Sequence, residues 1–186
     1  TAAAPAHVRP KIAVVTPYYK EPLAMLEQCH KSVTEQDVDA EVMHFLIGDG
    51  VECPEIRNWS AMHMVLPQSH GDNGNTPRGI GCILAVAAGA DFIAYLDADN
   101  WFYENHLSSL LDLHQKSGAP VCCSLRTFHV PDGTEIDVKE KLEDSNAHVD
   151  TSCYLISREA FRLNNVWHQM PRPLSPICDR VFYSAV

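Results

Sequence analysis

The chain has 186 residues, of which 46% are hydrophobic, enough for one sizeable core and too few for two comfortable domains. Its 24 acidic residues outnumber its 14 basic ones, and the net charge of -10 excludes nucleic acid and anionic membranes as natural partners. No stretch approaches the ~18 apolar residues of a transmembrane segment, and the Ala- and Pro-rich start lacks the apolar run of a signal peptide. We therefore expect a tail over 1–10, a single domain over 11–186 and a cytoplasmic protein.

Strands and helices alternate along the chain, and most of the strands are continuous apolar runs. This pattern indicates an α/β fold with a mainly parallel sheet covered on both faces. The polar stretch 131–150 is predicted to be a hairpin or a mobile loop. The predicted strands cover residues 11–16, 41–47, 62–66, 92–96, 121–128 and 151–156, and the predicted helices cover residues 22–35, 80–90, 107–116, 158–163 and 176–186.

The carboxyl ends of parallel strands lie at one edge of a sheet and form a ligand crevice there. Thr16, Asp49 and Asp97 each end a predicted strand, so we expect them to converge on this edge. The seven cysteines show no Cys-x-x-Cys pair and no regular spacing to histidine, which favours reduced thiols over a disulfide framework or a zinc site.

The sharpest local feature is Asp97-Ala98-Asp99, which follows the buried strand 92–96. Two carboxylates this close repel each other unless a positive group lies beside them. Mg²⁺ and Mn²⁺ take oxygen ligands, often one or two carboxylates completed by water and substrate phosphates. The motif therefore predicts a divalent-cation site for a diphosphate. The alternative is a strand end with two solvated aspartates in an Asx turn.

The motifs in chain order resemble glycosyltransferase family two and its relatives, over roughly residues 11–128 and more loosely beyond. The resemblance implies a GT-A (nucleotide-diphospho-sugar transferase) fold, with a nucleotide-binding half over 11–100 and an acceptor half over 101–186. Catalytic domains of the family usually continue further, so part of the acceptor half is expected beyond Val186. The matching segments are Thr16-Pro17-Tyr18, Gly48-Asp49-Gly50, Asn73-Gly74, Arg78-Gly79-Ile80-Gly81 and Asp97-Ala98-Asp99.

By this resemblance the ligand is a nucleotide sugar, a UDP-sugar with a GDP-sugar as rival, and the acceptor is a carbohydrate or another hydroxyl compound. Each matched position then has an implied role. Thr16, Pro17 and Tyr18 line the base pocket, with the Tyr18 ring stacked on the base. Asp49 accepts a hydrogen bond from the imide N–H of uracil. Arg78 lies near the base or the diphosphate, Asp97 contacts ribose or the metal, and Asp99 ligates Mn²⁺ or Mg²⁺.

An inverting transfer needs a general base, which in the family is an acidic residue, often within Glu-Asp, at the start of a late helix. Asp179 occupies the comparable position and is the candidate, although Cys178 stands in the place of the Glu. His148 and Asp150 are weaker rivals. Two further departures are Gly79, where an Asn commonly follows the Arg, and Asn100, which replaces a frequent third Asp.

Two alternatives stay open: a donor-binding domain without transfer activity, and a retaining transferase that needs no base at Asp179. Trp101 and Phe102 either wall the sugar pocket or pack in the core. A phosphatase of the haloacid-dehalogenase class would place its Asp-x-Asp after the first strand. A nicotinamide-binding enzyme would need G-x-G-x-x-G directly after a strand, which Gly79-Ile80-Gly81 does not complete.

Overall fold

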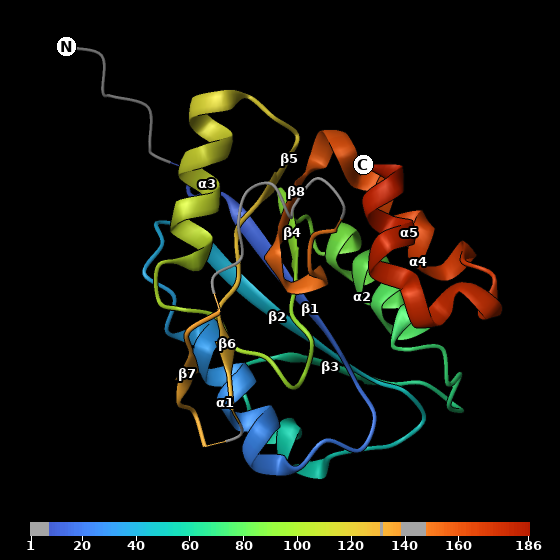
Figure 1. The fold of residues 1–186 in the computed structure, drawn as a ribbon. Coiled ribbons are helices and arrows are strands. Elements are labelled where there is room, and N and C mark those ends of the chain that lie inside the picture. The colour runs from blue at the N-terminus through green and yellow to red at the C-terminus, as the bar shows by residue number, and fades with distance from the viewer. Residues whose placement is uncertain (1–7, 131, 139–147) are drawn as a thin grey trace.

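The computed structural model describes residues 8–130, 132–138 and 148–186. A six-stranded sheet forms its centre (Figure 1). Its first four strands are mutually parallel, and only β8 runs antiparallel to its neighbours β4 and β5, which confirms the predicted, mainly parallel sheet. The order across the sheet is β3 (Met62–Val65), β2 (Glu41–Gly48), β1 (Lys11–Tyr18), β4 (Phe92–Tyr95), β8 (Tyr154–Ser157) and β5 (Val121–Cys123).

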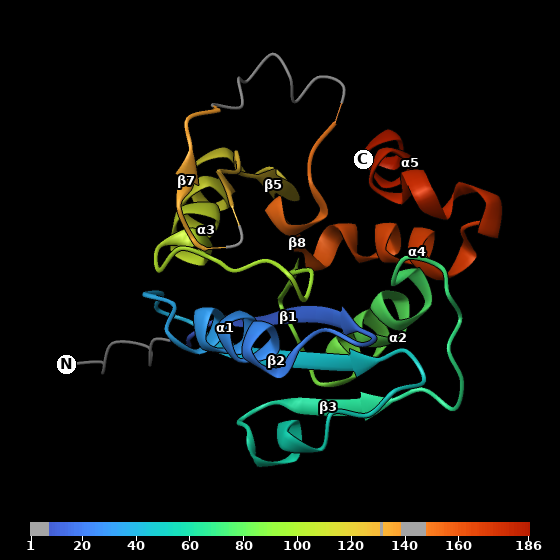
Figure 2. The ribbon, with the colours of Figure 1, turned by 60° about the horizontal axis from the view of Figure 1, so that its bottom comes forward.

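Helices cover both faces of the sheet, α1 and α3 on one side and α2, α4 and α5 on the other (Figures 1 and 2). The connections in the described part of the chain include the 3-10 segments η1 (Pro54–Asn58), η3 (Thr151–Cys153), η4 (Arg158–Asn164) and η5 (Arg172–Ile177). The helices are α1 (Leu23–Thr34), α2 (Asn75–Ala87), α3 (His106–Ser117), α4 (Asn165–Gln169) and α5 (Cys178–Ala185).

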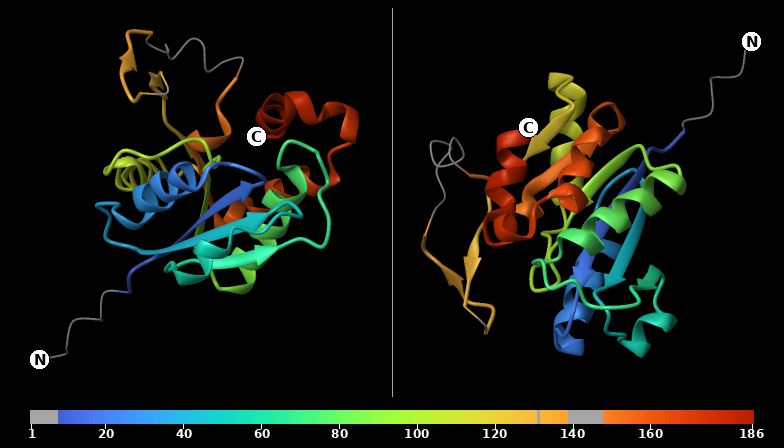
Figure 3. Two further views of the ribbon diagram at one scale, coloured as in Figure 1. Left: turned by 90° about the horizontal axis from the view of Figure 1, so that it is seen from below. Right: turned by 90° about the vertical axis from the view of Figure 1, so that its right-hand side faces the viewer.

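The two cores follow from the alternation of side chains along β1. Ile12 and Val14 lie in the core beneath α1 and α3, whereas Ala13 and Val15 pack with α2, α4 and α5. All four side chains are fully buried, as expected for a central strand with helices on both sides. The view from the side of α2 shows α4 and α5 lying next to it over the same face (Figure 3).

Helix α2 begins five residues before the predicted start at Ile80, a correction with two local causes. Pro77 lies in the first turn, where its missing N–H leaves no hydrogen bond unmade. Gly81 lets the helix approach the sheet, because a Cβ at this position would lie 2.4 Å from Cγ1 of Val15. A proline and glycines that looked like helix breakers are therefore compatible with the helix.

The predicted strand over 121–128 is wrong in its length, because the chain leaves the sheet after Cys123. It then forms a small hairpin of β6 (Phe128–His129) and β7 (Glu135–Ile136), which confirms a hairpin at the start of 131–150. Residues 139–147 of that prediction lie outside the described residues. The predicted helix 158–163 is the 3-10 segment η4, and the short helix α4 follows it unpredicted. Among the described helices none has the length and apolarity to cross a bilayer.

Candidate functional site

A cavity of about 480 Å³ opens at the carboxyl ends of β1, β2 and β4, which we call the strand-end cavity. The register explains the convergence: Tyr18 at the end of β1 pairs with Gly48 at the end of β2, and the Asp49 N–H donates to the Tyr18 carbonyl at 2.7 Å. The loop before α2 and the first turn of that helix complete the wall. Six of the seven predicted donor and metal residues line it: Pro17, Tyr18, Asp49, Arg78, Asp97 and Asp99.

Arg78 reaches the cavity from the first turns of α2 and forms an ion pair with Asp97, Nη2 to Oδ1 at 2.5 Å. The residue is 2% exposed, and its guanidinium lies 4.7 Å from the ring centroid of Trp167 in α4. Burial disfavours the charged guanidinium, but the nearby Asp97 carboxylate outweighs it and raises the pKa of Arg78. The acidic chain therefore has a fixed positive charge at the cavity.

Asp99 lies next to this pair, and no cation contacts its carboxylate among the described residues. Burial, and then the charge of Asp97, raise the pKa of Asp99 above its ordinary value. A cation placed here would relieve both penalties. The described residues hold no cluster of three or more His, Cys, Asp or Glu side chains suited to a metal. Two carboxylates fit a Mg²⁺ or Mn²⁺ ion that takes its other ligands from water and phosphate, rather than an all-protein metal site.

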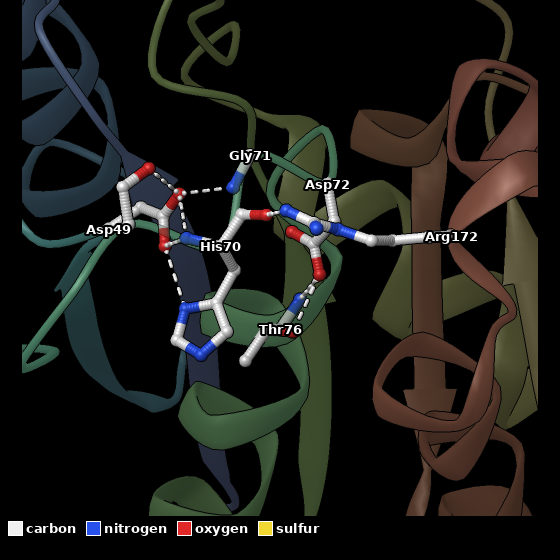
Figure 4. Close-up of polar contacts among 7 residues, drawn as sticks. Asp49, His70, Gly71, Asp72, Thr76 and Arg172 are labelled. Carbon is white, nitrogen blue, oxygen red and sulfur yellow. Dashed lines mark hydrogen bonds and ion pairs between the residues drawn. The ribbon is translucent and has the colours of Figure 1, made fainter.

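The loop between β3 and α2 closes over Asp49 (Figure 4). The Asp49 carboxylate accepts hydrogen bonds from the Ser69 hydroxyl at 2.9 Å, from the His70 N–H at 2.9 Å and from the Gly71 N–H at 3.2 Å, and it contacts Nδ1 of His70 at 3.1 Å. Burial alone would raise the pKa of Asp49, but these hydrogen bonds outweigh it and lower the pKa. Arg172 of η5 donates to the His70 carbonyl and ties the loop to the far side of the cavity (Figure 4).

The contacts of this loop with Asp49 were not predicted from the sequence, and they change the expected role of Asp49. A carboxylate offers about four lone-pair sites, and the loop already uses that number. A nucleobase N–H reaches Asp49 only in exchange for one of the loop donors. At the other end of the loop, Asp72 accepts from the Thr76 N–H at 3.0 Å and from its hydroxyl at 2.5 Å, which secures the start of α2.

The structure places Thr16 away from the cavity, contrary to its predicted role at the base. Its side chain is buried on the α1 side of the sheet, and its hydroxyl lies 2.9 Å from Nε2 of His44. Tyr18 does line the cavity but is only 3% exposed. Its hydroxyl accepts from the Cys53 N–H at 3.2 Å and lies 2.7 Å from Nε2 of His63. The Tyr18 side chain is thus largely buried, and its hydroxyl contacts hold it in place.

Asp179, the predicted base, lies in the first turn of α5 and not in the wall of the strand-end cavity. One of its oxygens accepts from the Arg180 N–H at 2.7 Å, and the other lies 3.2 Å from Nε2 of His148. The structure thereby joins the predicted base to one of its two rivals. The other rival, Asp150, forms an ion pair with Arg126 at 2.6 Å.

A second cavity of about 360 Å³, which we call the hairpin cavity, lies on the other side of Asp99. Asp99 lines both cavities. Trp101 lines the hairpin cavity with its ring 4.9 Å from that of His129. Phe102 lines it too, but is largely buried in the core beneath α1 and α3. Asp99 is therefore a residue that the two cavities share.

The fold is shared with solved structures of S. aureus TarS, a glycosyltransferase. TarS 1-349 in complex with UDP matches with a TM-score of 0.69 and 16% sequence identity, over 93% of this chain and 54% of that chain. TarS 1-349 in complex with UDP-GlcNAc matches with a TM-score of 0.66 and 15% identity, over 92% and 54%. No protein-family model and no curated protein matches the chain. The chain spans about half the length of these structures, and it has the GT-A glycosyltransferase fold predicted from its sequence.

Proposed function

We propose that the chain is the donor-binding and catalytic part of a nucleotide-sugar glycosyltransferase. The observation that supports this most is the meeting of Arg78, Asp97 and Asp99 at one cavity, at the strand ends of a GT-A fold. Solved structures of TarS with this fold contain UDP and UDP-GlcNAc, so a UDP-sugar is the proposed donor. Since the net charge of -10 repels an anionic ligand, the donor diphosphate needs these local groups.

A divalent cation, Mn²⁺ or Mg²⁺, fits beside Asp99 with Asp97 as its neighbour. When bound it would neutralise charge that develops on the leaving diphosphate. Asp99 would offer the cation a carboxylate that no Lys or Arg side chain contacts among the described residues. Arg78 of α2 forms an ion pair with Asp97 and holds that second carboxylate in place. The guanidinium is pre-organised by its stacking on Trp167, which reduces the conformational entropy lost when the diphosphate arrives.

The acceptor is proposed to enter through the hairpin cavity, because this cavity shares Asp99 with the strand-end cavity proposed for the donor. Its wall offers aromatic faces, Trp101 among them, together with the ion pair of Arg126 and Asp150. Such a mixture suits a hydroxyl-rich ring better than an apolar ligand. Asp179 and His148 supply the basic group for an inverting transfer.

UDP should stabilise the protein against heat only when Mn²⁺ is present, because the diphosphate and the carboxylates repel each other without the cation. Asp99→Ala should abolish the metal-dependent part of the shift, and Asp97→Asn should reduce it less. Thermal-shift titration of UDP with Mn²⁺ or with EDTA measures this, since a ligand that binds the folded state raises its stability by mass action. Equal stabilisation in EDTA, or a full Mn²⁺-dependent shift in Asp99→Ala, would contradict the proposed metal site.

UDP should compete better than CDP for the strand-end cavity. Uracil has an imide N–H that Asp49 can accept in exchange for the His70 ring, whereas neutral cytosine has none. GDP is the serious rival, because guanine also carries a ring N–H. Competition of the three nucleotides against a fluorescent UDP analogue measures the order, and equal affinity for CDP and UDP would refute the role of Asp49.

Hydrolysis of UDP-GlcNAc in the presence of Mn²⁺ tests whether the site carries out chemistry. A donor-binding domain without transfer activity would bind UDP and leave the sugar attached. Release of free sugar above the spontaneous rate, lost in Asp99→Ala, would support the transferase. A release rate that Asp99→Ala leaves unchanged would point to a contaminating activity.

A further inference from the structure

Both carboxylate oxygens of Asp179 contact a neighbouring group in the structure. Its Oδ1 accepts a hydrogen bond from the Arg180 N–H at 2.7 Å, and its Oδ2 lies 3.2 Å from Nε2 of His148. A carboxylate accepts and does not donate, so a neutral His148 that donates to Asp179 carries its ring proton on Nε2. Each oxygen of the predicted base therefore already has one partner, whereas the lone pair on Nδ1 of His148 has none among the described residues.

That Nδ1 atom is buried and has no hydrogen-bond partner among the described residues. A buried acceptor without a partner costs about 1–3 kcal/mol, so such a group needs a reason to persist. The contact between His148 and α5 does not explain the unpaired Nδ1, because that contact is made by Nε2 alone. An unpaired ring nitrogen beside an oriented carboxylate is instead the arrangement of a general base waiting for a hydroxyl.

Both residues are sequence neighbours of residues at or near the two cavities. His148 precedes Asp150 by two residues, and Asp150 lines the hairpin cavity together with Asp99. On the side of α5, Asp179 follows Cys178. Burial raises the pKa of that thiol, and the charges of Arg78 and Asp97 are near enough to influence it. His148 is thus two residues from a wall residue of the hairpin cavity, and Asp179 is next to a thiol that the charges of Arg78 and Asp97 reach.

We propose that His148 takes the proton from the acceptor hydroxyl and that Asp179 is its positioning residue, a refinement that rests on the proposed function. The acceptor oxygen forms a bond to the anomeric carbon as the bond from that carbon to the diphosphate oxygen breaks. The diphosphate leaves with the bonding electron pair, and the hydroxyl proton moves to Nδ1 of His148. Asp179 fixes the Nε2–H tautomer and stabilises the imidazolium ion that forms.

The tautomer gives a test that does not depend on turnover. Long-range ¹H–¹⁵N spectra of the neutral protein should show His148 protonated at Nε2. His114 is the internal reference for the opposite tautomer, because its Nδ1 lies 2.8 Å from the Ala119 carbonyl. In Asp179→Asn the amide oxygen keeps the bond from the Arg180 N–H and the amide nitrogen faces His148, so the His148 signal should switch to Nδ1–H. A wild-type His148 protonated at Nδ1 would overturn the proposal.

Turnover of UDP-GlcNAc with water as acceptor tests the base itself. His148→Gln should lower kcat by about 10²-fold and leave KM for the donor nearly unchanged, the usual pattern for loss of a general base. His114→Gln is the matched control and should keep wild-type kcat. If His148→Gln keeps more than half of the turnover while Asp179→Asn loses it, Asp179 is the base and the proposal fails. If the wild-type protein binds UDP without hydrolysing UDP-GlcNAc, the proposed role of His148 as the base is also overturned. Failure to bind UDP would instead overturn the proposed function.

Discussion

Lowering the pH from 6.5 towards 3 should remove several kcal/mol of stability through His44. This ring is fully buried, and burial, followed by the neighbouring His30, lowers the pKa of His44 from 6.5 to about 3. The unfolded chain therefore binds the proton at a higher pH than the folded one. The stabilisation is complete above 6.5 and is lost as the pH falls through that window, up to about 5 kcal/mol at 1.36 kcal/mol per pKa unit.

His44 contacts both β1 and α1 from its buried position in β2. Its Nε2 lies 2.9 Å from the Thr16 hydroxyl in β1, and its Nδ1 lies 2.9 Å from Nδ1 of His30, whose ring stacks on it and on Trp59. A charge on His44 would have no carboxylate partner among these contacts. Burial likewise lowers the pKa of His106, to about 4, so this histidine adds to the loss in the same direction.

Urea unfolding as a function of pH measures the effect. The free energy of unfolding of the wild type should fall steeply below pH 6.5, and His44→Gln should flatten this slope while lowering stability at neutral pH. His114→Gln leaves the buried His44 intact and should retain the wild-type slope. The same slope in His44→Gln and the wild type would show that other groups determine the acid transition.

The position of the site could be predicted from the sequence because strand ends in a parallel sheet share one edge. Pro17, Asp49 and Asp97 follow or end apolar runs, and the register of β1 with β2 and β4 brings them to one cavity. Thr16 was predicted to lie at the cavity because the first predicted strand ended at residue 16, two residues before the end of β1. With β1 extending to Tyr18, side-chain alternation puts Thr16 on the same face as Val14, towards α1.

The contacts that define the electrostatics of the site were beyond prediction, because they join segments without periodicity. The His70 loop that covers Asp49 has no regular pattern, and nothing in the sequence pairs His148 with Asp179. Trp167 gave no signal either, because η4 and the short helix α4 lack the long apolar spacing that reveals a helix. The antiparallel direction of β8 is likewise set by packing that local composition does not encode.

Trp167→Ala should lower the free energy of unfolding by about 3–5 kcal/mol, the range for truncation of a large buried aromatic ring. The side chain is 1% exposed and stacks on Phe182 of α5 with ring centroids 4.5 Å apart. Its edge-to-face contact with Tyr95 of β4 has a centroid distance of 5.4 Å, and Arg78 lies over its ring. The Trp167 ring therefore contacts the sheet, the helix that carries Asp179, and Arg78 at the strand-end cavity.

Loss of this ring should weaken donor binding as well as stability, because Arg78 then loses the surface that orients its guanidinium towards Asp97. Trp167→Phe restores an aromatic face and should recover much of both quantities. Leu113→Ala, an exposed position on α3, is the control and should change stability by no more than about 0.5 kcal/mol. Urea titration with an unchanged m-value, combined with UDP binding below the unfolding transition, separates the two effects. If Trp167→Ala destabilises the protein while UDP binds with wild-type affinity in Mn²⁺, the ring supports the core alone, and Arg78 is oriented by Asp97 without it.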